Sequence, residues 1–195
     1  LLYIINADIF SVTKMPKALV LMAEGFEEIE LSNIVDILRR GGVTVTVAGL
    51  KEGLIAGAHG IKMQPDTSLD SVKEMHDAIV LPGGYPGFVN LGKDQRVLDL
   101  VNKYNSERKF VTAICGAPSV LAKAGVLAGK NATIYRGMEG ELKGAKPVDR
   151  QVVEDGKLIT SQGPGTAMVF ALTILEKLTN EKKAKEIREQ LLFKG

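Results

Sequence analysis

The sequence predicts an α/β fold in which helices cover both faces of a mostly parallel sheet. Two observations carry this prediction. Short apolar runs, typical of strands that are buried on both faces, alternate with longer amphipathic segments. The strand-like and helix-like segments also follow one another repeatedly, as they do in β–α–β units. Binding sites in such sheets form beyond the carboxyl ends of the strands, so we examined those positions closely.

The first half of this pattern runs from Lys17 to the turn after residue 81. Residues 17–23 form a continuous apolar run and predict a buried strand. Residues 27–42 predict a helix, because acidic residues occupy its first turn and Arg-Arg-Gly-Gly ends it. Residues 43–50 are rich in β-branched side chains and predict a second strand. Residues 54–66 resemble a small hairpin, and residues 77–81 predict a strand that Pro-Gly-Gly stops.

The second half of the chain continues the alternation. Residues 95–108 predict a helix and residues 110–115 a strand. Residues 117–127 predict a helix, with Pro118 near its first turn. The remaining segments predict, in order, a strand, a hairpin and two helices, at residues 131–135, 148–161, 166–178 and 181–193.

The chain length of 195 residues suits one domain. Residues 1–15 are apolar but lack a basic leader and contain Asp8, which argues against a secretory signal. We therefore treat residues 1–15 as an extension that need not belong to the native protein, with Met15 as a candidate start. Residues 16–195 are expected to form the single domain.

Composition and charge argue against several classes of partner. The net charge of +2, without a cluster of lysines or arginines, gives no reason to expect nucleic acid or an anionic membrane surface as a partner. No apolar run approaches the roughly 20 residues of a membrane span. The single cysteine cannot form an internal disulfide, so we expect a protein that does not depend on an oxidising compartment, and a cytoplasmic location.

The single cysteine, Cys115, lies where a predicted strand turns into a predicted helix. Small residues stand two positions before it and two after it, as in a nucleophile elbow, where a tight turn presents the side chain to a cleft. A helix start would lower the pKa of the thiol, and its backbone N–H groups would stabilise an oxyanion. We therefore interpret Cys115 as a reactive nucleophile. The alternative is a buried cysteine that acts only as a small hydrophobic side chain.

Glu30 falls on the edge of the apolar stripe of its predicted helix. Ile34 and Ile37 lie four and seven residues further on, close to the same face. A carboxyl group there is partly desolvated, which raises its pKa and suits a proton carrier near neutral pH. The alternative is a carboxylate that reaches solvent at the helix end. Glu27 and Glu28 are explained by the helix dipole alone.

The remaining candidate groups give weaker signals. Gly83 and Gly84 allow the backbone to approach a ligand, although Pro-Gly-Gly is also an ordinary turn. His59 lies in the predicted hairpin and His76 at the amino end of a strand, so neither suits a partner for Cys115, and both are expected to be surface residues. No combination of His, Cys, Asp and Glu has the spacing of metal ligands, and no metal site is predicted.

Four motifs together resemble the DJ-1/PfpI family, also called ThiJ/PfpI, and most closely its DJ-1 branch. The similarity covers Lys17 to about Phe193, and the motifs occur in the expected order: "AEGFEEIE", "VLPGG", "AICGAP" and "SQGPGT". The resemblance implies a flavodoxin-like three-layer sandwich, similar to class I glutamine amidotransferases, and a homodimer. It also implies that Cys115 is the nucleophile, that Glu30 is its protonated hydrogen-bond partner, and that Gly83, Gly84 and Gly116 frame an oxyanion pocket.

Two residues depart from patterns in that family. PfpI-type peptidases carry a histidine directly after the cysteine, whereas this chain has Gly116, which argues against a peptidase. The DJ-1 branch often has a histidine in the strand that faces the cysteine, and the matching residue here is Tyr135. A tyrosine hydroxyl can donate a hydrogen bond but is a poor base at neutral pH.

We therefore expect a cysteine enzyme that needs no cofactor and acts on small reactive dicarbonyls, of the glutathione-independent glyoxalase or deglycase type. Cys115 would be the nucleophile and Glu30 the general acid and base, with Tyr135 beside the substrate. The alternative is an oxidative-stress sensor or chaperone that works through oxidation of Cys115.

Overall fold

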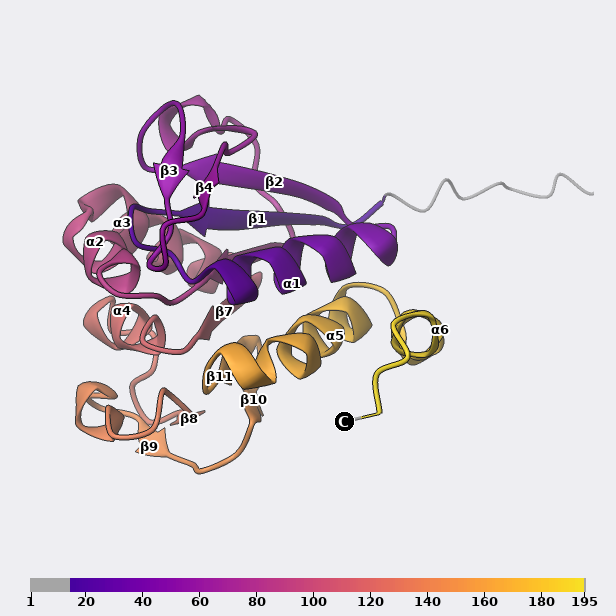
Figure 1. Ribbon diagram of the computed structural model, residues 1–195. Coiled ribbons are helices and arrows are strands. Elements are labelled where there is room, and N and C mark those ends of the chain that lie inside the picture. The colour runs from indigo at the N-terminus through magenta and orange to yellow at the C-terminus, as the bar shows by residue number, and fades with distance from the viewer. Residues whose placement is uncertain (1–14, 195) are drawn as a thin grey trace, which may run out of the picture.

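The computed structural model describes residues 15–194, and the sheet in it is sandwiched between two layers of helices (Figure 1). The helices are α1 (Glu28–Arg40), α2 (Gly87–Lys93), α3 (Gln95–Ser106), α4 (Pro118–Lys123), α5 (Ala167–Leu178) and α6 (Glu181–Gln190). The longer strands are β1 (Lys17–Met22), β2 (Thr44–Gly49), β6 (Ala78–Leu81), β7 (Phe110–Ile114), β10 (Val152–Asp155) and β11 (Leu158–Ser161). The two-residue strands are β3 (Ile55–Ala56), β4 (Lys62–Met63), β5 (Thr67–Ser68), β8 (Asn131–Ala132) and β9 (Lys146–Pro147).

The main sheet has seven strands in the order β10-β11-β7-β6-β1-β2-β5. Every neighbouring pair is parallel except β10 with β11, which form the antiparallel hairpin at one edge. Because β1, β6 and β7 are central and parallel, their carboxyl ends meet at one edge of the sheet. The segments that follow these strands carry most of the candidates, namely Glu30 in α1 after β1, Gly83 and Gly84 after β6, and Cys115 and Gly116 after β7.

Alternate side chains of β1 enter the cores on opposite faces of the sheet, as the period of two in a strand requires. Ala18, Val20 and Met22 pack with α1 and α5 on one face. Leu19 and Leu21 pack with α3 and α4 on the other. Helix α6 lies outside α5, against which it packs (Figure 1). This double burial explains the continuous apolar run that predicted the strand.

The predicted fold class, a flavodoxin-like α/β sandwich with a mostly parallel sheet, is confirmed. The hairpins expected at 54–66 and 148–161 are present as β3–β4 and β10–β11. No helix within residues 15–194 is long and apolar enough to cross a membrane. The interpretation of residues 1–15 as an extension concerns, except for Met15, residues that lie outside those described.

One predicted strand is largely wrong. Of residues 131–135, only Asn131 and Ala132 form a strand, and they pair with β9 outside the main sheet. The rest of the segment is held by single hydrogen bonds. The Thr133 N–H donates to the Thr160 hydroxyl at 2.9 Å, and the Tyr135 N–H donates to the Cys115 carbonyl at 2.9 Å. The β-branched residues that suggested a strand are therefore buried without a ladder of backbone bonds.

Candidate active site

Cys115 lies at the first position after β7, in a turn that few residues other than glycine adopt. Its φ angle is +63°, in the left-handed region, which costs free energy for a residue with a side chain. Its N–H donates to the Ser161 carbonyl at 3.0 Å, and this bond ties the turn to the end of β11. The thiol is half-buried, neither sealed in the core nor fully exposed. The backbone is that of a nucleophile elbow, as the sequence predicted.

Gly116 completes this turn because there is no room for a side chain beside it. A Cβ atom at this position would lie 2.6 Å from the Phe88 ring. Phe88 belongs to α2, a helix that the sequence did not predict, because Pro86, Gly87 and Gly92 have a low helix propensity. Phe88 is thus a neighbour of the site that sequence reasoning missed.

Glu30 extends from the first turn of α1 and is completely buried. Its Oε2 atom accepts a hydrogen bond from the Gly83 N–H at 2.7 Å. Its Oε1 atom is also buried and has no hydrogen-bond partner among the described residues. A bare anionic oxygen in that position would be costly, whereas a protonated Oε1 needs only a nearby acceptor.

Gly83 lies between this carboxyl group and the thiol, and its lack of a side chain lets the two groups lie close to each other. A Cβ atom at Gly83 would lie 2.5 Å from the Cβ of Cys115, 3.0 Å from its sulfur and 2.9 Å from Oε2 of Glu30. Only a glycine lets the two side chains approach across this point. The N–H group of Gly83 is committed to Glu30, whereas the N–H groups of Gly84 and Gly116 act on the thiol and lower its pKa.

The pKa values of both groups are raised. Burial raises the pKa of Glu30 to about 7, although the hydrogen bond from the Gly83 N–H lowers it in part. Burial, followed by the negative charge of Glu30, raises the pKa of the Cys115 thiol to about 12. The N–H groups of Gly84 and Gly116 lower this pKa, but by less. The prediction that a helix start lowers the pKa of this thiol is therefore wrong. Helix α4 begins only at Pro118 and has six residues, and burial outweighs it.

The two shifts together describe a pair of groups that share one proton. The pair loses its first proton near pH 7, and the second is held until the pH is far higher, because burial and then the negative charge of Glu30 oppose a second ionisation. Once Glu30 carries the shared proton, it no longer repels the thiolate. The pair therefore has a second form of the same net charge, in which Cys115 is a thiolate and Glu30 carries the proton.

Tyr135 lies beside this pair, with about half of its side chain exposed. Its backbone is bonded to the carbonyl of Cys115, and its ring approaches Gly163 in the loop after β11. Sequence reasoning therefore found residues that the fold brings together at one edge of the sheet, namely Glu30, Gly83, Gly84, Cys115, Gly116 and Tyr135.

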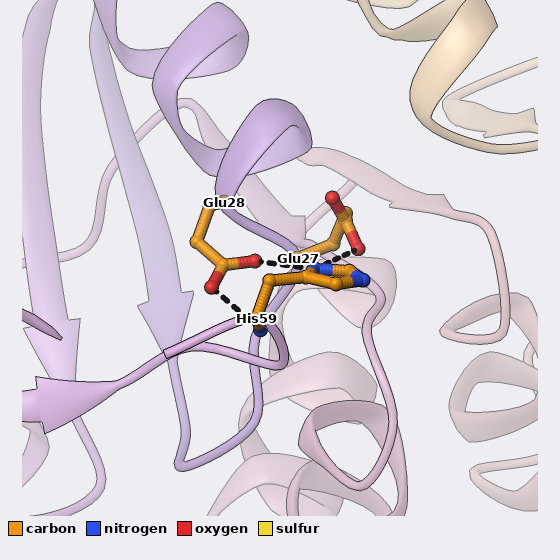
Figure 2. A group of neighbouring side chains, drawn as sticks. All are labelled: Glu27, Glu28 and His59. Carbon is orange, nitrogen blue, oxygen red and sulfur yellow. Dashed lines mark hydrogen bonds and ion pairs between the residues drawn. The ribbon is translucent and has the colours of Figure 1, made fainter. Parts of the chain in front are cut away.

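His59 is a surface residue, as the sequence suggested, whereas His76 is not. His76 is buried: its backbone N–H donates to the Tyr104 hydroxyl at 3.1 Å, and its ring lies 3.0 Å from the Thr46 hydroxyl. The ring of His59 is exposed but contacts two buried carboxylates, those of Glu27 and Glu28 (Figure 2). No metal-ligand spacing is visible in the sequence for these three residues, because His59 comes from the β3–β4 hairpin and joins Glu27 and Glu28 only in the fold.

Comparison with known proteins identifies the chain. Its sequence matches the DJ-1/PfpI family over residues 16–177. The chain belongs to the DJ-1/PfpI family. It is 44% identical to protein dj-1beta of Drosophila melanogaster over 179 residues, which cover 90% of this chain and 96% of the relative. The crystal structure of Drosophila melanogaster DJ-1beta superposes with a TM-score of 0.90 and covers 92% of this chain and 98% of that one.

Two further family members bear on function through their names. A deglycase of Pyrococcus abyssi is 37% identical over 153 residues, which cover 76% of this chain and 91% of the relative. A structure of oxidized Toxoplasma gondii DJ-1 is 32% identical, with a TM-score of 0.89, and covers 92% of this chain and all of that one. The predicted membership of the family and of its DJ-1 branch is confirmed.

Proposed function

We propose that this protein is a cysteine enzyme that acts on small reactive dicarbonyls, with Cys115 as nucleophile and Glu30 as proton carrier. The observation that carries the proposal is the shared-proton pair. The half-buried Cys115 lies across Gly83 from a fully buried carboxyl group, and the pKa of that carboxyl is raised to about 7. A group that titrates near the working pH can both give and take a proton.

The proposed reaction begins when the Cys115 thiolate attacks the aldehyde carbon of a 2-oxoaldehyde such as methylglyoxal. A C–S bond forms, and the carbonyl oxygen takes up the electron pair. The backbone N–H groups of Gly84 and Gly116 stabilise the developing oxyanion, and Glu30 supplies its proton to give a hemithioacetal.

Glu30, now a carboxylate, removes the proton from the carbon attached to sulfur. The electron pair moves through an enediol, and the same proton is delivered to the neighbouring carbon, leaving a thioester of a hydroxy acid. Water then cleaves the thioester, releases lactate and regenerates the thiol. The net change is the addition of one water to methylglyoxal, so no electron acceptor and no cofactor are required.

The Pyrococcus abyssi relative, named a deglycase, supports an enzymatic role in this family. A deglycase substrate is an adduct of such a dicarbonyl with an amine or thiol, and hydrolysis of that adduct would use the same nucleophile and proton carrier. We extend the proposal to these adducts. Small carbonyl compounds are thus the proposed substrate class.

A second candidate function is redox sensing, with or without chaperone activity. The half-exposed Cys115 favours it, as does the relative whose structure is named as oxidized DJ-1. Oxidation of the thiolate to a sulfinate would be stabilised by a protonated Glu30. A PfpI-type peptidase is disfavoured, because Gly116 follows the cysteine and neither histidine is paired with Cys115.

We further propose a cytoplasmic homodimer, from the family resemblance and the single cysteine. Light scattering during size-exclusion chromatography tests this directly. A mass near twice 21.0 kDa is expected, and a mass of one chain would contradict the dimer.

The experiment for the enzymatic proposal is the formation of lactate from methylglyoxal without glutathione. We expect wild-type protein to form lactate and Cys115→Ser to be at least about 100-fold slower. Equal rates in the two proteins would overturn the proposal. Mass spectrometry after mild peroxide then tests the second function. A gain of two oxygens on Cys115 supports it, and no gain counts against it.

A further inference from the structure

We propose that Glu27, Glu28 and His59 form a binding site for a divalent transition-metal cation, for which zinc is the best match. Figure 2 shows the imidazole ring of His59 beside the two glutamate side chains. One potential ligand atom from each residue lies within 4.8 Å of the other two. The site adjoins the Cys115–Glu30 pair, since the charge of Glu27 acts on Glu30, but its ligand atoms are different ones and its proposal does not depend on the proposed enzymatic reaction.

The distances approach those of a zinc site. Nδ1 of His59 lies 3.0 Å from Oε2 of Glu28 and 3.5 Å from Oε2 of Glu27. Zinc bonds of about 2.0–2.2 Å in a tetrahedron separate neighbouring ligand atoms by about 3.3–3.6 Å. Both ligand pairs that involve His59 are therefore near the required spacing. The two carboxylates are within 4.8 Å of each other, and a small rotation of their side chains would close that third edge.

The carboxylate of Glu28 is held in place by groups that are not ligands. Its Oε1 atom accepts hydrogen bonds from the His59 N–H at 2.7 Å and from the Ile61 N–H at 3.3 Å. Its Oε2 atom is thereby turned toward the imidazole. Gly57 leaves room for this arrangement, since a Cβ atom there would collide with the carboxylate. Such outer contacts, which fix the orientation of a ligand, are typical of metal sites.

The electric charge of the cluster also favours a dication. Glu27 and Glu28 are 7% and 4% exposed, and their carboxylates form no ion pair with a lysine or arginine among residues 15–194. A protonated His59 neutralises only one of the two negative charges. A dication bound to a neutral imidazole neutralises both and releases the imidazole proton.

Access and ligand type complete the argument. The His59 side chain is 71% exposed, so a hydrated ion can reach Nδ1 from solvent while the two buried carboxylates lie behind the ring. Three protein ligands would leave a position for water. Imidazole together with carboxylates suits zinc better than calcium or magnesium, which prefer oxygen ligands alone.

Calorimetric titration of the full chain with zinc chloride, after dialysis against a chelator, tests this proposal. The titration is made in wild-type protein and in Cys115→Ser, because a thiolate can itself bind zinc. We expect one zinc ion per chain in both proteins. His59→Ala, made in the Cys115→Ser background, should bind at least about tenfold more weakly. Since the His59 side chain is exposed, this variant is expected to fold normally.

Matched substitutions separate the site from ordinary surface acidity. Glu27→Gln should weaken zinc binding about as much as His59→Ala does, whereas Glu52→Gln, at an exposed carboxylate in the loop after β2, should bind like its parent. Zinc binding that is unchanged by His59→Ala, or that disappears with Cys115→Ser alone, would overturn the proposal. Calcium or magnesium that binds while zinc cannot compete would overturn it as well.

Discussion

Two glutamates in the first turn of α1, Glu28 and Glu30, are both buried, yet their pKa values move in opposite directions. Glu30 has one N–H partner, and burial raises its pKa to about 7. Glu28 receives hydrogen bonds from His59 and from backbone N–H groups, which together outweigh its burial and lower its pKa. Burial alone therefore does not set the charge of a carboxyl group. Glu28 and Glu30 are only two residues apart in the helix, yet Glu28 is an anion and Glu30 has the pKa of a proton carrier.

The largest effect that we expect from the difference between these two glutamates is on catalysis, and it is measured with Glu30→Gln. Glu30→Gln keeps the shape of the side chain and an N–H donor but cannot carry a proton, so lactate formation should fall by about 100-fold or more. Glu24→Gln is the control, because Glu24 is an exposed carboxylate in the loop before the same helix, where it pairs with Lys51. It should stay within about threefold of wild type. Equal rates in Glu30→Gln and Glu24→Gln would show that Glu30 carries no proton.

The second effect is on the way in which the stability of the fold depends on pH. Glu30 has a raised pKa, so the free energy of unfolding should decrease as the pH rises from 4.5 to about 7, while the buried carboxyl resists ionisation. The groups that act on it are the Gly83 N–H, Cys115 and Glu27. Glu30→Gln, which removes this titration, should gain stability relative to wild type over that range, by up to about 3 kcal/mol.

Glu28 should show the opposite dependence, because its pKa is lowered. Its contribution is present above its unfolded pKa and is lost as the pH falls. Glu28→Gln should therefore be less stable than wild type at pH 7, and the deficit should shrink in acid. Urea unfolding at several pH values measures both variants. Parallel curves for Glu28→Gln and Glu30→Gln would contradict the distinction between the two residues.

A third effect concerns the glycine between the thiol and the carboxyl group. Gly83→Ala would place a methyl group 2.5 Å from the Cβ of Cys115, so we expect a loss of about 1–3 kcal/mol of stability and at least a tenfold loss of activity. Gly140→Ala is the control, since a Cβ atom there meets nothing within 4 Å. Thermal unfolding and the lactate assay compare the two. Equal behaviour of both variants would mean that Gly83 does not set the spacing of the pair.

The smallest effect is expected at Tyr135. The family resemblance matches Tyr135 to a histidine of the DJ-1 branch, but a tyrosine hydroxyl is a poor base, so Tyr135→Phe should slow lactate formation by less than about tenfold. The ring and the backbone bond to Cys115 are retained in this variant. A loss as large as that of Glu30→Gln would make Tyr135 a proton carrier in its own right.

Much of this fold could be predicted from the sequence, because strands buried on both faces, such as β1 and β6, appear as continuous apolar runs. Helix α2 was missed because its proline and glycines disfavour a helix, and tertiary packing of Phe88 and Leu91 overrides that preference. The β-branched residues of segment 131–135 favour a strand. They cannot reveal that the Thr133 N–H bonds to the Thr160 hydroxyl and not to the backbone of a neighbouring strand.

The candidate site was predictable to a lesser degree. The small residues around Cys115 revealed the elbow, and the apolar stripe around Glu30 revealed a buried carboxyl group. The pKa of the thiol could not be read from its place before a helix, because burial in the fold raises it most, followed by the charge of Glu30, 85 positions earlier in the chain. The cluster of Glu27, Glu28 and His59 was hidden for the same reason, since a hairpin brings in its histidine.

The central proposal is that transfer of the shared proton from Cys115 to Glu30 leaves a reactive thiolate near neutral pH, although burial and the charge of an ionised Glu30 raise the pKa of the thiol. The rate of Cys115 alkylation by iodoacetamide, measured against pH, tests it most directly in wild type, Glu30→Gln and Glu30→Leu. We expect the reactive thiolate to appear near pH 7 in wild type, to persist in Glu30→Gln, which keeps a donor, and to need a pH at least about one unit higher in Glu30→Leu. A wild-type thiol that reacts only above the pH at which a free cysteine ionises, or that reacts identically in Glu30→Leu, would contradict the claim.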